Sequence, residues 1–295
     1  MPRVALVSSA EARHHDTDLP LITAALGTLG IASEIIDWDT AAADWGQFDA
    51  AVVRSPWDYH RRYDEFLAWL EAVSASTRLF NDAGVIRWNT DKTYLAELAA
   101  AGLPVIPTTF VGGAQALVDA TEAGVLSGDV VVKPTVSAGS NNTERHRSTR
   151  IRAVAHVASL IDMQMTAMVQ PYQGAIDEMG ESGLLYFNGE YSHAFRKGAI
   201  LSTGDNVKNG LFTEEDIGER EATAVERGLG DRVMAYVTAR FGAPPLYARV
   251  DMVPGTGGEP VLMEVELAEP SLFLHTSHGA AGRFAGAVAS VVSVP

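Results

Sequence analysis

The chain has 295 residues, a formal net charge of −15, 47% hydrophobic residues and no cysteine. The length predicts two or three packed domains, and the composition is that of an α/β protein without repeats or low-complexity tracts. The negative charge argues against nucleic-acid binding, because phosphate backbones are held by an excess of Lys and Arg. The absence of cysteine excludes disulfides, thiolate metal sites and Cys nucleophiles.

The N-terminus runs directly into an apolar segment, without the basic region and small-residue cleavage site of a secretory signal. No stretch approaches the roughly 18 apolar residues of a membrane-spanning helix. We therefore expect a cytoplasmic protein with no membrane partner. The oligomeric state is left undecided, because exposed strands near the N-terminus could support a homo-oligomer.

The first part of the chain predicts a parallel sheet. Apolar runs at Val4–Val7, Ser33–Trp38 and Ala50–Arg54 predict strands, and helical spacing at Leu19–Leu29 and Tyr63–Val73 predicts the helices between them. Such alternation places ligands at the loops that leave the carboxyl ends of the strands. The loop after the third strand reads Arg54-Ser55-Pro56-Trp57-Asp58-Tyr59.

From residue 89 onward the pattern changes. A helix is expected from Asn89, with Thr90 as its N-cap and Gly102 as its C-terminal stop. We place domain limits there and after residue 168, which gives domains 1–88, 89–168 and 169–295. The polar stretch Gly198–Glu215 is expected to be a mobile loop. Further strands are expected at Asp129–Lys133, Met168–Tyr172, Gly183–Phe187, Tyr191–Arg196, Leu246–Val253 and Glu259–Leu267.

The last two strands flank a Pro-Gly-Thr-Gly-Gly segment at residues 254–258 and predict a hairpin. With the turn centred late in that segment, Asp251 lies opposite Glu264 and Arg249 lies opposite Glu266. The two-residue period of a strand places all four side chains on one face.

Directly opposed side chains lie about 5 Å apart, so Asp251 and Glu264 need a neutralising charge. Mg²⁺ is typically held by carboxylates and substrate phosphates, which fits this cluster better than a zinc site without His or Cys. The alternative is a solvated face on which Arg249 pairs with Glu266. Spacing alone leaves both interpretations open.

Lys133 ends a strand that reads as buried, where an ammonium group needs an anion. A nucleotide phosphate is one candidate, and the small-residue loop from Ser137 to Ser140 could cradle phosphates with its backbone N–H groups. An ordinary turn at the surface is the alternative. Lys92, early in the predicted helix, is open to the same two interpretations.

Other nucleotide and catalytic signatures do not occur. The sequence has no Gly-Lys-Ser/Thr phosphate loop, no GxGxxG after a strand, no HExxH and no GxSxG, which disfavours P-loop enzymes, dinucleotide dehydrogenases, zincins and α/β-hydrolases. Loop histidines more often bond substrate or solvent than metal. We assign no metal to His14, His15, His275 and His278.

Taken in chain order, these segments resemble the ATP-grasp superfamily, in particular D-alanine:D-alanine ligases and glutathione synthetases. The resemblance rests on Asp91-Lys92, Leu103-Pro104-Val105, Val131-Val132-Lys133-Pro134, Gln170-Pro171-Tyr172, Ala248-Arg249-Val250-Asp251 and Met263-Glu264-Val265-Glu266. It implies an α/β fold, α+β in the nucleotide-binding part, behind an N-terminal parallel-sheet domain. It also implies a ligase that uses ATP and one or two Mg²⁺ ions, for which Mn²⁺ could substitute.

The resemblance also assigns site residues. Those implied for ATP are Lys92, Lys133, Ser137, Gly139, Ser140, Gln170, Pro171, Tyr172, Asp177 and Glu178. Those implied for metal are Asp251, Glu264 and Glu266. Those implied for catalysis are Arg249, Arg196 and Lys133, and those for substrate are Arg54, Ser55, Trp57, Asp58, Glu269 and Ser271.

Two features depart from the usual pattern, because Glu266 stands where the family has Asn and an extra residue precedes Pro270. The Arg54–Asp58 loop and Glu269-Pro270-Ser271 resemble a bacterial subgroup that includes the cyclo-ligase of D-cycloserine biosynthesis. This implies that the carboxyl of O-ureido-D-serine is activated as an acyl phosphate and attacked by its own oxygen-linked nitrogen, with loss of the carbamoyl group.

Two alternatives stay open. The first is an intermolecular amino-acid or peptide ligase of the glutathione-synthetase type, with a small carboxylate and a separate amine as substrates. The second, of another class, is a non-catalytic ATP-binding module.

Overall fold

The computed structural model describes residues 1–147, 150–199 and 216–292. The described strands are β1 (Arg3–Ser8), β2 (Ala32–Asp37), β3 (Ala50–Ser55), β4 (Leu79–Phe80), β5 (Thr109–Val111), β6 (Val130–Pro134), β7 (Glu144–His146), β8 (Ala167–Pro171), β9 (Glu181–Phe187), β10 (Glu190–Lys197), β11 (Ile217–Arg220), β12 (Tyr247–Pro254) and β13 (Pro260–Glu266). The described α-helices are α1 (Asp18–Thr28), α2 (Tyr63–Ser74), α3 (Ala83–Thr90), α4 (Tyr94–Ala100), α5 (Ala114–Glu122), α6 (Arg150–Asp162), α7 (Ile176–Met179), α8 (Ala224–Phe241) and α9 (Ala280–Val292). Short 3₁₀ helices are η1 (Trp45–Gln47), η2 (Tyr59–Arg61) and η3 (Leu274–Thr276).

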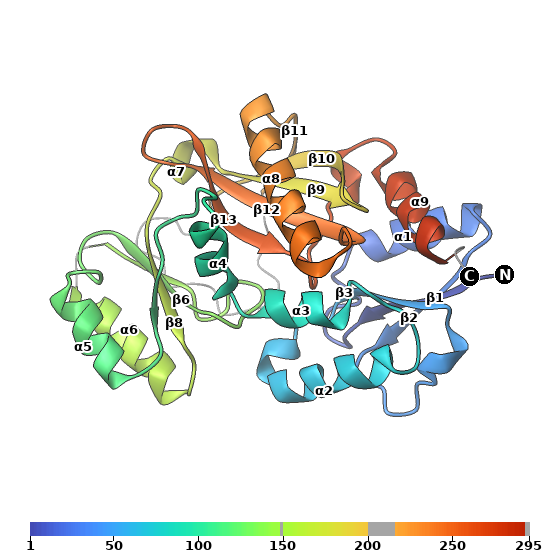
Figure 1. Cartoon of the computed structure of the whole chain (residues 1–295), viewed down its shortest axis with the longest axis horizontal. Helices are drawn as coiled ribbons and strands as arrows, with labels where there is room; N and C mark the ends of the chain where they lie inside the picture. Colours follow the sequence, from blue (N-terminus) through green and yellow to red (C-terminus); the bar gives the residue numbers. More distant parts are fainter. Residues whose placement is uncertain (148–149, 200–215, 293–295) are drawn as a thin grey trace.

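The N-terminal sheet is parallel and has the strand order β2-β1-β3-β4. The side chains of β3 are all buried, as are nearly all those of β1, which explains their continuous apolar runs. Helix α2 packs on one face, and α1 packs on the other together with α9. Figure 1 shows α9, from the end of the chain, lying beside α1 from its beginning.

The middle of the chain forms an antiparallel sheet of order β5-β8-β6-β7. Helices α5 and α6 pack against it and lie together at one end of the molecule (Figure 1). Their shared core includes Val132, Val157 and Leu160, which are fully buried. This unit leaves the loop after β6 free to face the rest of the molecule.

The last sheet is antiparallel, with the order β11-β10-β9-β12-β13. Helices α4 and α8 pack on the face that carries Val250 and Met252. The opposite face carries the acidic and basic side chains of β12 and β13. A parallel N-terminal sheet followed by two antiparallel sheets confirms the predicted α/β class with an α+β nucleotide-binding part.

The helix predicted to start at Asn89 is wrong. Asn89 and Thr90 end α3, which begins after Asp82, whose side chain accepts a hydrogen bond from the Gly84 N–H at 2.8 Å. The next helix, α4, starts only at Tyr94. A side-chain cap at Asp82 and the tertiary bonds of Asn89 therefore override the local capping signal at Thr90.

The predicted domain limits after residues 88 and 168 fall inside α3 and β8. A division into three domains stays a prediction, and its limits would have to be drawn outside these two elements. Of the stretch predicted to be a mobile loop, residues 200–215 lie outside the described residues.

Among the helices that the structure describes, none combines the length and apolar composition needed to cross a bilayer.

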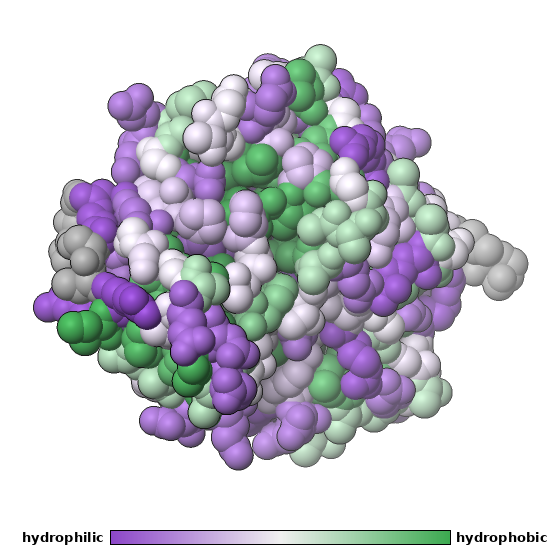
Figure 2. All heavy atoms as spheres, turned by 60° about the vertical axis from the view of Figure 1, so that its left-hand side comes forward, coloured by the Kyte–Doolittle hydropathy of each residue, from purple (hydrophilic) through white to green (hydrophobic). Residues whose placement is uncertain are grey.

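Figure 2 shows a face on which hydrophilic residues dominate the periphery and hydrophobic residues gather near the centre.

Asn89 joins α3 to the C-terminal hairpin. Its side-chain amide donates to the Val265 carbonyl at 2.6 Å and accepts from the backbone N–H groups of Leu267 and Ala268 at 2.6 and 3.1 Å. The Tyr94 hydroxyl donates to the Val265 carbonyl and accepts from the Val265 N–H. These buried bonds fix the end of β13 against the helical layer.

We expect Asn89→Ala to lower the free energy of unfolding by at least about 2 kcal/mol, because it leaves two buried N–H groups and one carbonyl without that partner. Denaturant titration measures the change. Gln115→Ala, which removes an exposed amide from α5, is the matched control and should change stability by less than about 0.5 kcal/mol. Equal stability of the two variants would contradict this prediction.

Candidate active site

The C-terminal hairpin has the predicted register at the end away from its turn. Arg249 pairs with Glu266 and Asp251 pairs with Glu264 across β12 and β13. Closer to the turn the register shifts by one residue, so that Met252 pairs with Leu262 and Met263 is the extra residue of a bulge. The prediction that the four charged side chains share a face is confirmed.

This face forms one wall of a cavity of about 620 Å³ between the last sheet and the central sheet. Its lining includes fifteen of the predicted site residues: Trp57, Lys92, Lys133, Ser137, Gly139, Ser140, Gln170, Pro171, Tyr172, Arg249, Asp251, Glu264, Glu266, Glu269 and Ser271. Because these residues come from every part of the chain, the fold brings together what the sequence holds far apart.

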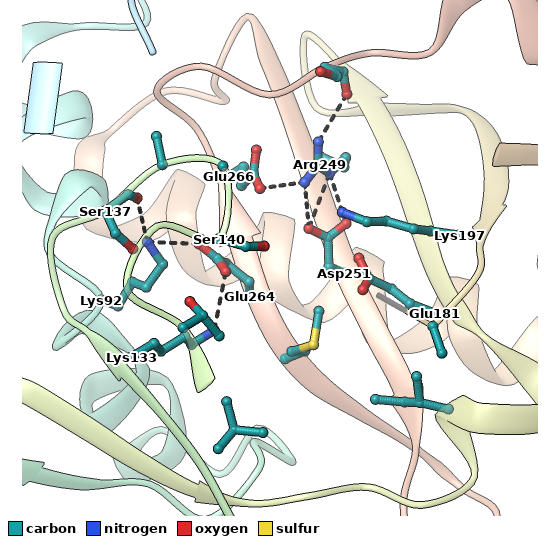
Figure 3. Close-up of a pocket in the computed structure, with 18 of the residues that line it drawn as sticks. Lys92, Lys133, Ser137, Ser140, Glu181, Lys197, Arg249, Asp251, Glu264 and Glu266 are labelled. Atoms are coloured by element: carbon teal, nitrogen blue, oxygen red, sulfur yellow. Dashed lines mark hydrogen bonds and ion pairs between the residues drawn. The ribbon is translucent and has the colours of Figure 1, made fainter. Parts of the chain in front are cut away.

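Two lysines converge on one carboxylate. The Lys92 ammonium lies 3.1 Å from Glu264, and the Lys133 ammonium lies 3.6 Å from the other oxygen of the same group (Figure 3). Lys92 also donates to the Ser137 carbonyl at 3.0 Å, which ties it to the loop after β6. Burial alone would raise the pKa of Glu264, but the two ammonium groups outweigh it and hold that pKa below its usual value.

Arg249 holds the two other carboxylates. Its guanidinium donates to Asp251 at 2.9 Å, and it also donates to Glu266 and to the Ser271 carbonyl. The side chains of Arg249 and Asp251 are only 7% and 2% exposed, so this face is not solvated, but the pairing of Arg249 with Glu266 that the alternative predicts is present. Burial raises the pKa of Glu266 even though Arg249 opposes the rise, so this carboxylate is short of positive charge.

Glu269 forms the border with the N-terminal sheet. Burial raises its pKa to about 7, although Lys92 and the Tyr59 hydroxyl act in the opposite direction. Its backbone carbonyl accepts a hydrogen bond from the Trp57 indole at 3.0 Å. The Arg54–Asp58 loop and the Glu269-Pro270-Ser271 segment, which come from opposite ends of the chain, therefore meet at the cavity.

The central sheet supplies the opposite wall. Gln170 is buried and donates to Thr108 at 2.9 Å, and the Tyr172 N–H donates to the Asp129 carbonyl at 2.9 Å. The Arg145 guanidinium stacks on the Tyr172 ring at 3.2 Å. Apolar Ile106, Val131 and Met263 also line this part of the cavity, which suits a flat aromatic ring.

Six predicted site residues are not among the described residues that line the cavity: Arg54, Ser55, Asp58, Asp177, Glu178 and Arg196. Arg54 is fully buried, donates to the Pro270 carbonyl and lies over the Tyr247 and Phe284 rings. One of its nitrogens thus has a structural partner, whereas the buried Nε and Nη1 have no hydrogen-bond partner among the described residues, and a role toward substrate stays a prediction.

Four of the other five have side-chain partners of their own. Ser55 bonds Ser8 at 2.8 Å, and Asp58 accepts from the Trp38 indole at 2.9 Å. Arg196 donates to the Met179 carbonyl at 2.9 Å. Asp177 interacts with Tyr172 and Arg145. Glu178 lies in the short helix α7, of which Ile176 reaches the cavity.

The cavity is also lined by residues to which the sequence analysis assigned no site role: His15, which was considered only as a metal ligand, and Glu181 and Lys197, which were missed. Lys197 follows Arg196 at the end of β10, and strand alternation directs two such neighbours to opposite faces. Which of the two side chains faces the cavity depends on the orientation of β10, and the sequence does not reveal that orientation.

Solved structures of low sequence identity share this fold. D-alanyl-alanine synthetase A from Vibrio cholerae O1 biovar eltor str. N16961 aligns with a TM-score of 0.72 and 14% identity over 99% of both chains. The ATP-grasp ligase PsnB, solved with a phosphomimetic variant of its minimal precursor, Mg and ADP, aligns with a TM-score of 0.64 and 16% identity over 98% of both chains. The chain therefore has the ATP-grasp fold.

Higher identity connects it to one family within this class. The cycloserine biosynthesis protein DcsG of Streptomyces lavendulae is 41% identical over 293 residues, 97% of each chain. The family model "D-cycloserine synthetase DcsG, N-terminal domain" matches residues 4–81. The crystal structure of D-cycloserine synthetase DcsG aligns with a TM-score of 0.91 and 39% identity over 99% of this chain and 100% of that one. The chain belongs to the DcsG family.

Gly183 lies opposite Asp251 on β9, where no side chain fits. A Cβ there would come within 2.2 Å of the Phe195 ring and 3.1 Å of the Asp251 carboxylate. We expect Gly183→Ala to lower the free energy of unfolding by about 1–3 kcal/mol through this overlap.

Gly228→Ala is the control, since that glycine lies in α8 with nothing within 4 Å of an added Cβ. It should raise stability by about 0.5–1 kcal/mol through helix propensity. Thermal or denaturant unfolding gives the free energy of unfolding of both variants. A change of the same sign in the two free energies would contradict the steric argument.

Proposed function

We propose that this chain closes the ring of D-cycloserine by activating the carboxyl group of O-ureido-D-serine with ATP. Membership in the DcsG family and the ATP-grasp fold make it an ATP-dependent ligase in D-cycloserine synthesis, and not a non-catalytic nucleotide-binding module. The substrate itself, the site residues and the ions they hold are proposals. A cytoplasmic location and a homo-oligomer also stay predictions.

The observation that supports the proposal most is the charge arrangement of the cavity. Lys92 and Lys133 share Glu264, while Arg249 is shared between Asp251 and Glu266. Three carboxylates of the last sheet and three cations, of which Lys133 comes from the central sheet, form a set that can exchange partners when a metal-bound triphosphate enters. In that exchange the lysines would turn to phosphate oxygens and the carboxylates to metal.

The nucleotide would lie between the two antiparallel sheets. Its base would face Ile106, Val131 and the hinge at residues 170–172, and its phosphates would reach Lys92 and Lys133. The loop from Ser137 to Ser140 lines the same cavity, and Gly139 and Ser140 adopt positive φ angles, which expose backbone N–H groups in a tight turn.

The carboxylates fit Mg²⁺ by their chemistry. Asp251, Glu264 and Glu266 offer only oxygen ligands, and burial disfavours the charge of Glu266 in the absence of further cations. One or two Mg²⁺ ions held there, or Mn²⁺ in their place, would neutralise phosphate charge during transfer. Arg249, directly beside them, is positioned to stabilise the transferring phosphoryl group and later the oxyanion.

The N-terminal side of the cavity would hold the amino acid. His15, Trp57, Glu269 and Ser271 line it there. The substrate carboxylate would take the phosphoryl group, and its own oxygen-linked nitrogen would then attack the acyl carbon and release phosphate. Hydrolysis of the carbamoyl group on that nitrogen, which consumes one water and releases carbon dioxide and ammonia, would complete D-cycloserine. Glu269, with a pKa near 7, is suited to accept the proton of that nitrogen.

The test of intramolecular closure is phosphate release in the presence of ATP and Mg²⁺. O-ureido-D-serine alone should support turnover and yield D-cycloserine in equal amount to phosphate. Pairs of D-amino acids and amines, the substrates expected of a glutathione-synthetase-type ligase, should not exceed the background. If only pairs release phosphate, cyclisation is wrong and the intermolecular alternative holds.

Arg249→Lys keeps a positive charge but loses the planar donor pair that reaches both Asp251 and Glu266. We expect kcat to fall by about 10²–10³-fold, with ATP affinity close to that of the wild type. Steady-state kinetics and calorimetric ATP titration measure the two effects. Arg232→Lys, an exposed arginine of α8, is the control; an unchanged kcat in Arg249→Lys would remove it from the chemistry.

A further inference from the structure

A second group of ligand-type side chains lies on the central sheet, outside the cavity. It consists of Glu144, His146 and His156, which we call the β7–α6 cluster. Their ligand atoms all lie within 4.8 Å of one another. We propose that the β7–α6 cluster binds one divalent transition-metal ion, for which zinc is the best match.

Two elements build the cluster. Glu144 and His146 are two residues apart on β7, so both side chains point to the same face of the sheet. Helix α6 packs on that face and contributes His156. Arg145, between the two ligands, points the other way and binds Asp129. A metal would therefore join the edge strand of the sheet to its covering helix.

The distances match a zinc site. His146 Nε2 and His156 Nδ1 lie 3.1 Å apart. Two nitrogens on a tetrahedral zinc, each about 2.05 Å from the ion, lie about 3.3 Å apart. The Glu144 carboxylate is 3.8 Å from His146 Nε2, and its side chain is 42% exposed, so it can rotate inward without displacing other groups.

The ordinary alternative is a hydrogen bond between the two rings. In that arrangement one ring donates its N–H and the other accepts, which uses only one of the two lone pairs that a pair of neutral imidazoles can offer. A metal uses both lone pairs and the carboxylate as well. His146 is 6% exposed, which holds its ring in place for either partner.

The donor set separates this cluster from the active-site carboxylates. Two imidazoles with one carboxylate suit zinc and related borderline ions, whereas oxygen-only sets suit magnesium. None of the three residues is among the described residues that line the cavity. Excess Mg²⁺ should therefore fill the active site without occupying the β7–α6 cluster.

The positive charge of Arg152 opposes metal binding at the β7–α6 cluster, and Thr143 connects the cluster to the cavity. Arg152 lies on α6 one turn before His156 and acts electrostatically on His146, but it is exposed and screened by solvent. Thr143, directly before Glu144, lines the ATP cavity. Fixing β7 to α6 would thus also fix one edge of that cavity.

The test uses the full chain, freed of metal with a chelator and held in excess Mg²⁺ and ADP. Calorimetric titration with zinc should give one site per chain. Cobalt should produce the visible absorption bands of a tetrahedral site with nitrogen ligands. His156→Ala, at a half-buried position, should weaken zinc binding at least roughly tenfold, and Glu144→Gln should weaken it in the same direction.

His278→Ala, an exposed histidine far from α6 in the sequence, is the matched control and should bind zinc as the wild type does. Circular dichroism checks that each variant is folded. The proposal is overturned if no saturable zinc site persists in Mg²⁺ and ADP, or if folded His156→Ala and Glu144→Gln bind zinc as tightly as the wild type. Because Mg²⁺ and ADP are present throughout, either result leaves the proposed ligase activity untouched.

Discussion

Everything in the active site depends on mutual neutralisation among buried ions. Glu264 lies between two lysines, and Arg249 lies between two carboxylates. A buried charge without a partner is strongly unfavourable, whereas a paired one is nearly balanced. In the proposed function, a charged nucleotide would rearrange these pairs at low cost, because each group it would take already faces the cavity.

Such a set is stable only if the strands that carry it cannot shift. Asn89 and Tyr94 hold Val265 and the residues after it by their backbone groups. Asp18, at the start of α1, accepts three backbone N–H groups from residues 272–274. Helix α1 thus anchors the segment that follows β13.

Much of this arrangement could be predicted from the sequence. The pairing of Asp251 with Glu264 was predicted from strand period and turn position, but the strands next to the turn pair one residue out of that register, and the bulge at Met263 restores the predicted pairs. The helix at Asn89 could not be placed, since Asn89 lies at the end of α3 and its side chain bonds Val265, Leu267 and Ala268, which are distant in the sequence. Arg54 was implied for substrate by the resemblance, and its full burial over the Tyr247 and Phe284 rings could not be predicted from the loop sequence. Lys197 was missed because orientation within β10 depends on tertiary contacts.

The bulge at Met263 has a consequence for how the hairpin can vary. On the turn side of the bulge the strands pair with one register, and on the active-site side they pair with another. A bulge absorbs a one-residue difference in length, so the register beyond it is set by the contacts of Val265 and not by the turn. Insertions or deletions between Pro254 and Pro260 can therefore be tolerated without reversing the direction of the acidic side chains, which makes this turn the place where length can change while the chemistry stays the same.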